Sequence, residues 1–157
     1  MITLALHRFI VTGAALAIVA YVGVASAFPI ARHTGKVLAT KGALAAAASS
    51  VDMYQTTCSK NVAGATFQLG TLVTSEKAGV VVSIQAIKGK LASHTTDTKG
   101  GDKIASPEVA LKGGDGVYTI LVNKSSAGAV NYSFEAHCET AKETHAGQTN
   151  PVLLQNQ

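Results

Sequence analysis

The stretch that decides the fold is residues 113–138, which read GGDGVYTILVNKSSAGAVNYSFEAHC. In its last part, apolar and polar residues alternate strictly, which is the pattern of a strand with one buried face. The apolar face would carry Val130, Tyr132, Phe134, Ala136 and Cys138, and the polar face Asn131, Ser133, Glu135 and His137. The first part is a β-branched run behind a glycine-rich turn, so a second strand is expected at 116–123. The segment 123–128 between them predicts a hairpin connection.

The rest of the chain follows the same pattern. The run Val80-Val81-Val82-Ser83-Ile84 is apolar on both faces and predicts a central strand at 79–88. Residues 89–106 predict a long polar loop with a tight turn at 99–102. Nothing in the chain has the rhythm of a strand–helix–strand unit. We therefore expect an all-β fold, an immunoglobulin-like antiparallel β-sandwich with Greek-key character. The expected strands are residues 51–58, 65–74, 79–88, 107–111, 116–123 and 130–138.

The chain contains two cysteines, Cys58 and Cys138, which are 80 positions apart. Each falls at the end of an expected strand, on the face that points to the core. A metal or redox pair is the alternative interpretation, but C-x-x-C spacing is absent. We predict a disulfide bond between the first and last expected strands, which the chain-entropy model values at about 4–5 kcal/mol.

A glycine-rich turn, residues 113–116, comes just before Tyr118. Such a turn ahead of a tyrosine that opens a strand is typical of a tyrosine corner, in which the phenol bonds a nearby backbone group of a Greek-key sandwich. We therefore predict a structural role for Tyr118 and Gly116.

The N-terminus predicts export. Residues 1–27 combine Arg8, an apolar run and the small-x-small sequence Ala25-Ser26-Ala27, which together indicate a signal peptide cleaved before Phe28. An uncleaved membrane anchor is the alternative, but an apolar run of about 16 residues is short for a bilayer. We expect a periplasmic or extracellular protein, with an Ala-rich arm or linker at 28–50, a β-sandwich domain at 51–138 and a flexible tail at 139–157.

The charge of the chain argues against nucleic-acid binding. Cleavage would remove one arginine and leave 12 basic residues against 9 acidic ones, a net charge of about +3. These basic residues are spread along the chain, whereas nucleic-acid binding needs a concentrated basic face. We expect no nucleic-acid partner and no membrane association after cleavage.

Three segments carry a family resemblance: Val51-Asp52-Met53-Tyr54, GGDGVYTILV at 113–122 and AVNYSFEA at 129–136. Residues 50–138 resemble the bacterial pre-peptidase C-terminal domain, an immunoglobulin-like β-sandwich commonly appended to secreted hydrolases. The resemblance implies a fold and no catalytic residues. The two cysteines and the middle loop depart from the family's pattern.

Catalytic and metal-binding arrangements are sparse in the sequence. Ser93, His94 and Asp97 could be written as a triad, but no nucleophile elbow surrounds the serine. The candidate metal ligands, His94, Asp97, Asp102 and His137, lack ligand spacing and are expected to be solvated. If Cys138 points inward, His137 points outward and could at most be one ligand on a surface strand. We therefore expect no cofactor and no catalytic residues.

These observations favour an exported, non-catalytic protein with a binding or structural role. Its partner would be a protein or a cell-surface polymer, contacted through an edge strand, the arm 28–50 or the loop 89–106. An envelope metal-binding protein is the first alternative, and a secreted hydrolase is the second.

Overall fold

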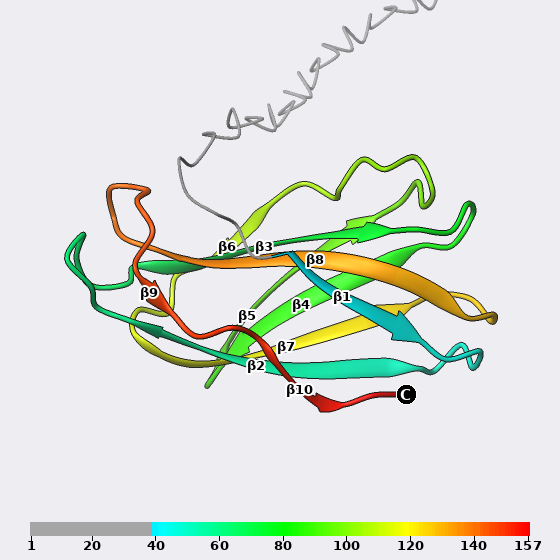
Figure 1. Ribbon diagram of the computed structural model, residues 1–157, viewed down its shortest axis with the longest axis horizontal. Coiled ribbons are helices and arrows are strands. Elements are labelled where there is room, and N and C mark those ends of the chain that lie inside the picture. The colour runs from blue at the N-terminus through cyan, green and yellow to red at the C-terminus, as the bar shows by residue number, and fades with distance from the viewer. Residues whose placement is uncertain (1–38) are drawn as a thin grey trace, which may run out of the picture.

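The computed structural model describes residues 39–157 (Figure 1). The expected signal peptide and residues 28–38 of the expected arm lie outside this range. The described chain is built from strands and loops, and it contains no helix long and apolar enough to cross a membrane. The strands are β1 (Ala39–Leu44), β2 (Val51–Ser59), β3 (Gln68–Ser75), β4 (Val82–Lys88), β5 (Leu91–Asp97), β6 (Val109–Leu111), β7 (Gly116–Lys124), β8 (Val130–Glu139), β9 (Gly147–Gln148) and β10 (Val152–Gln155).

The strands form two antiparallel sheets that pack face to face, which confirms the all-β sandwich. One sheet has the order β1-β8-β3-β6, and the other has the order β10-β2-β7-β4-β5 with β9 also paired to β2. Figure 1 shows them as two layers, with β3 and β8 above β2 and β7. Successive strands often lie in different sheets, as in a Greek-key sandwich. The six strands expected from the sequence are all present, within three residues at each end.

The core consists of the inward-facing residues of both sheets. Tyr54 of β2 meets Phe134 of β8 edge to face, with ring centroids 4.9 Å apart, so aromatic rings fill the space between the layers. Other fully buried apolar residues include Leu69, Val73, Val82, Ile84, Tyr118, Ile120, Val122 and Tyr132.

The predicted disulfide is confirmed. Cys58 and Cys138 are joined, their Cα atoms are 5.5 Å apart, and both residues are 1% exposed. Because β2 and β8 belong to different sheets, the bond links the two layers.

The turn before β7 has the hydrogen bond expected of Tyr118. Its phenol donates to the carbonyl of Gly114 at 2.7 Å. The Lys88 ammonium lies 4.7 Å from the centre of the Tyr118 ring and donates to the carbonyls of Gly113, Gly114 and Asp115. One aromatic ring and one cation therefore hold the whole glycine-rich turn. Gly116 has φ +122°, a conformation that favours glycine.

The connection between β7 and β8 differs from the predicted hairpin. Both edges of β7 are occupied, by β2 and β4, so the chain leaves that sheet and enters the other. Buried Lys124 supports this crossing by donating to the carbonyls of Ala45 and Gly128.

The expected arm is partly a strand. Within 28–50, residues Ala39–Leu44 form β1 and pair with residues 130–135 of β8. The sequence gives no alternating apolar pattern for this strand, because Leu44 is its one buried apolar residue. Gly42 is required there, since a Cβ atom would lie 2.3 Å from the Tyr132 ring and 2.6 Å from the Tyr54 oxygen.

The expected loop 89–106 contains strand β5. It pairs with β4 along its whole length, although its residues are mostly polar. An edge strand needs few apolar side chains because one of its faces and its free edge meet water. The expected tight turn is nevertheless present, with φ +88° at Gly101.

The expectation of a flexible tail at 139–157 is wrong, because β9 and β10 both pair with β2. Ala146 and Gln148 of this segment close the end of β8, which β1 does not reach. Gln148 accepts from the Cys138 amide at 2.9 Å and donates to the Ala136 carbonyl at 2.7 Å. The side-chain amide of Gln148 thus bonds to the β8 backbone as a neighbouring strand would. These bonds explain why the polar segment after β8 is ordered.

A buried hydrogen-bond chain connects the C-terminus to the core. Tyr54 bonds to Tyr132 at 2.8 Å, and Tyr132 donates to Asp52 at 2.6 Å. The second oxygen of Asp52 accepts from the Gln157 amide at 3.0 Å. Burial, and the bond to Asp52, raise the pKa of Tyr132, which keeps its phenol a donor.

We predict that replacing both cysteines, Cys58→Ala with Cys138→Ala, lowers the free energy of unfolding by about 3–5 kcal/mol, because the unfolded chain gains the entropy of a long open loop. Urea unfolding of the oxidised protein and of the variant measures the difference. Equal midpoints would show that the bond contributes nothing.

We also predict that Tyr132→Phe costs about 1–3 kcal/mol of unfolding free energy, because buried Asp52 loses a donor. Tyr54→Phe is the matched control: it removes a phenol that contacts Tyr132 and leaves the donor to Asp52 in place, so its cost should be smaller. The reverse order in thermal unfolding would contradict this account of the chain.

Candidate functional site

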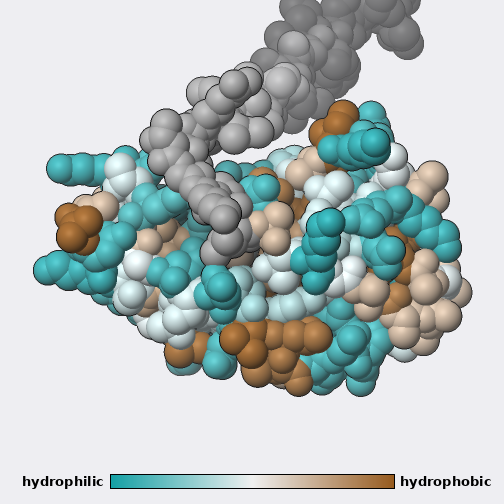
Figure 2. Space-filling model, viewed as in Figure 1, coloured by the Kyte–Doolittle hydropathy of each residue, from teal (hydrophilic) through white to brown (hydrophobic). Residues whose placement is uncertain are grey.

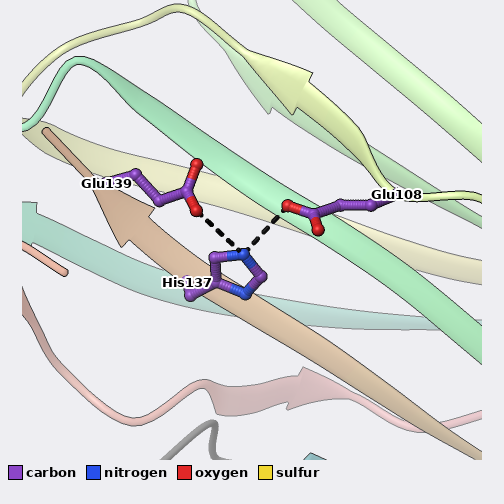
Figure 3. A group of neighbouring side chains, drawn as sticks. All are labelled: Glu108, His137 and Glu139. Carbon is purple, nitrogen blue, oxygen red and sulfur yellow. Dashed lines mark hydrogen bonds and ion pairs between the residues drawn. The ribbon is translucent and has the colours of Figure 1, made fainter. Parts of the chain in front are cut away.

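Three ionisable side chains converge on the outer face of the four-stranded sheet (Figure 3). Nε2 of His137 lies 2.9 Å from Oε1 of Glu108 and 3.3 Å from Oε1 of Glu139. Within residues 39–157, these three form the one group whose nitrogen, sulfur or carboxylate atoms are close enough together to hold a metal ion. We call this group the Glu-His-Glu cluster.

The sheet order positions the cluster. His137 and Glu139 lie two positions apart on β8 and therefore share a face. Glu108 directly precedes β6, which β3 separates from β8. Gly70 of β3 stands opposite His137, and a Cβ atom there would lie 2.3 Å from Oε1 of Glu108 and 2.8 Å from Nε2 of His137. Glycine therefore leaves the space over which the Glu108 and His137 side chains meet.

The cluster is buried, although it lies on the outer face. The side chains of His137 and Glu139 are 6% and 2% exposed, and that of Glu108 is 21% exposed. The segment after β8 folds back onto it: the Ala146 amide donates to the Cys138 carbonyl. The His145 ring centroid consequently lies 5.6 Å from that of His137.

This burial corrects one sequence expectation. His137 does point away from the core, as Cys138 requires, but it is not solvated. The polar residues that follow β8 pack over His137. The alternation of residues along β8 does not predict the position of that segment.

A polar neighbour, Gln68, fixes the carboxylate of Glu139. Gln68, the first residue of β3, donates from Nε2 to Oε2 of Glu139 at 2.6 Å, which leaves Oε1 directed at His137. Burial alone would lower the pKa of His137, but its hydrogen bonds to Glu108 and Glu139 raise that pKa to about 9. With no metal bound, these hydrogen bonds favour the protonated form of the imidazole.

The other candidate ligands do not join the cluster. His94 is exposed on the outer face of β5, and Asp102 is exposed and accepts from the Ile104 amide. Asp97 is buried, but its oxygens accept backbone amides of Ser75 and Lys99. Of the four ligands considered from sequence, only His137 belongs to a group of donors among the described residues.

The triad considered from sequence does not form. Ser93 and Asp97 lie on the face of β5 opposite to that of His94, because neighbouring residues of a strand alternate. Asp97 is also occupied by backbone amides. The three side chains therefore cannot act as nucleophile, base and orienting carboxylate.

Sequence reasoning missed Glu108 and Glu139 as partners of His137. Two signals were present: the His-x-Glu spacing at 137–139, which puts both side chains on one face, and a glycine inside the expected strand 65–74. Glu108 reaches His137 only because of the order of strands in the sheet. Residue spacing in the sequence does not reveal that order.

The second candidate feature is the edge formed by β10. All four of its residues are exposed, with Val152, Leu153 and Leu154 at 59%, 43% and 52%. Figure 2 shows a hydrophobic patch at the lower border of the molecule, where Figure 1 places β10.

Comparisons with protein-family models, curated proteins and solved structures find no match for this chain.

We predict a measurable consequence of the cluster's charges. In metal-free buffer, the His137 ring should titrate near pH 9 by NMR, and Glu108→Gln should lower that pKa because one carboxylate charge is lost. Since the folded pKa exceeds the ordinary value of 6.5, this stabilisation is complete below about pH 6.5 and is lost as pH rises through about 9. Glu108, Glu139 and His145 are titratable groups that face His137. A His137 pKa at or below 6.5 would contradict the geometry.

Proposed function

We propose that this chain is an exported β-sandwich protein with a non-catalytic binding role, and that β10 is the edge through which it binds. The predicted signal peptide supports export, as does the buried disulfide, because such bonds persist in oxidising compartments. The resemblance to the pre-peptidase C-terminal domain fits an accessory role of this kind. The observation that carries the proposal is the exposed apolar β10.

The β10 edge lacks the charged residues that commonly guard an exposed edge, although its register on β2 shifts between Leu153 and Gln155. Exposed edges are commonly guarded by charged residues, especially lysine. Residues 146–157 contain no charged side chain, and three of the four β10 residues are exposed and apolar. By contrast, β6 has only three residues and β5 is mostly polar. The fourth edge strand, β1, carries Lys41 and has one large apolar side chain, Leu44, which is buried. Among the edge strands of residues 39–157, β10 is therefore the best suited to accept another strand.

The β10 segment is also held at both ends. Before it, the Thr56 hydroxyl donates to the Thr149 carbonyl at 2.7 Å, and the Thr149 hydroxyl accepts from the Thr57 amide at 2.9 Å. After it, the Gln157 amide donates to Asp52. An edge fixed in this way has little conformational entropy to lose when a partner binds.

The partner we propose is an extended protein segment with apolar side chains. Its backbone would continue the six-stranded sheet, and its apolar side chains would cover those of β10. The other contacts expected from sequence are less suitable, because residues 39–44 of the arm already pair with β8 and β5 occupies much of 89–106. A cell-surface polymer would not use the backbone groups of an open edge.

We predict that Val152→Lys with Leu154→Lys abolishes partner capture by the full chain from envelope or culture fluid, because charge blocks strand addition. Leu91→Lys is the matched control: it also adds a lysine at an exposed leucine, on the edge strand β5, and should leave capture unchanged. Hydrogen exchange should then show protection of the β10 amides in the complex.

Equal capture by the β10 variant would contradict the proposal, as would capture of a polysaccharide in place of a protein. A change of the uncomplexed chain from dimer to monomer in the β10 variant would assign the edge to a second copy, which also contradicts it.

A further inference from the structure

We propose that Glu108, His137 and Glu139 form a binding site for a divalent transition-metal ion, with Zn²⁺ as the ion best suited to their donor atoms. The site is independent of the β10 edge. The donor set suits zinc, because one imidazole nitrogen and two carboxylate oxygens are ligands that zinc accepts.

The distances between the donor atoms also suit zinc. Ligand atoms bound to zinc at about 2.1 Å in tetrahedral geometry lie about 3.4 Å from one another. Nε2 of His137 is 2.9 Å from Oε1 of Glu108 and 3.3 Å from Oε1 of Glu139. All three donor atoms lie within 4.8 Å of one another. An ion therefore needs only small side-chain shifts to reach all three.

The two glutamates place negative charge at a largely buried position. Glu139 is 1% exposed. Its carboxylate and that of Glu108 both contact the same nitrogen, Nε2 of His137. Buried carboxylates are costly unless they are paired or bound to a metal. A divalent ion balances the formal charge of both glutamates while the imidazole binds in its neutral form.

Two residues of β3 prepare the donor atoms for an ion. Gln68 holds Oε2 of Glu139, which directs Oε1 toward the site in the way that outer hydrogen bonds orient metal ligands. Gly70 keeps open the space between Glu108 and His137. Both residues lie on β3, which runs between β8 and β6, so a bound ion would connect β8 to the segment before β6 across β3.

The test is a titration of the metal-free full chain with ZnCl₂ by calorimetry, together with elemental analysis. We expect one zinc ion per chain that Mg²⁺ and Ca²⁺ do not displace. His137→Gln should weaken binding at least about 100-fold, and Gln68→Leu about 10–100-fold, the usual range for an outer partner. His94→Gln, which changes an exposed histidine of β5, is the control and should bind as the native chain does.

Glu108→Gln keeps the test decisive if the buried histidine variant fails to fold, because Glu108 is the most exposed of the three ligands. It should weaken zinc binding at least about tenfold while circular dichroism stays native. As a second measurement, Co²⁺ should broaden the NMR signals of the His137 ring before those of His94.

Three results would overturn the proposal. The first is zinc binding that neither His137→Gln nor Glu108→Gln weakens. The second is binding lost in His94→Gln, which would place the ion on the surface. The third is a folded native chain that takes up no zinc.

Discussion

The covalent link between Cys58 and Cys138 is the constraint on which the rest of the structure depends. It joins β2 of one sheet to β8 of the other and so fixes where the two layers meet. Because residues alternate along β8, the same constraint fixes the outer face: with Cys138 directed inward, His137 and Glu139 are directed outward, side by side. The Glu-His-Glu cluster and the disulfide therefore lie on opposite faces of the same end of β8.

The segment after β8 connects the two candidate features. It covers His137, closes the end of β8 through Gln148 and then runs along β2 as β9 and β10. Its last residue bonds to buried Asp52. One polar segment thus buries the cluster and presents the apolar edge, although the two features lie on different sheets.

How much of this could be predicted depends on the range of the interactions. Tyr118 and Gly114 are four residues apart, so the tyrosine corner was visible in the sequence, and the alternation of β8 predicted both its faces. β5 and β10 were missed because edge strands need no inward apolar pattern, and β10 has only four residues behind Pro151. The cluster was missed because Glu108 reaches His137 only through the order of three strands and the absence of a side chain at Gly70.

The central claim is that one disulfide pins the two sheets at β2 and β8. The most direct measurement is mass spectrometry of peptides from the native chain, digested without reduction and with free thiols blocked. The account predicts one linked pair of peptides, containing Cys58 and Cys138, and no blocked thiol. Alkylated Cys58 and Cys138 in freshly isolated, folded protein would contradict it.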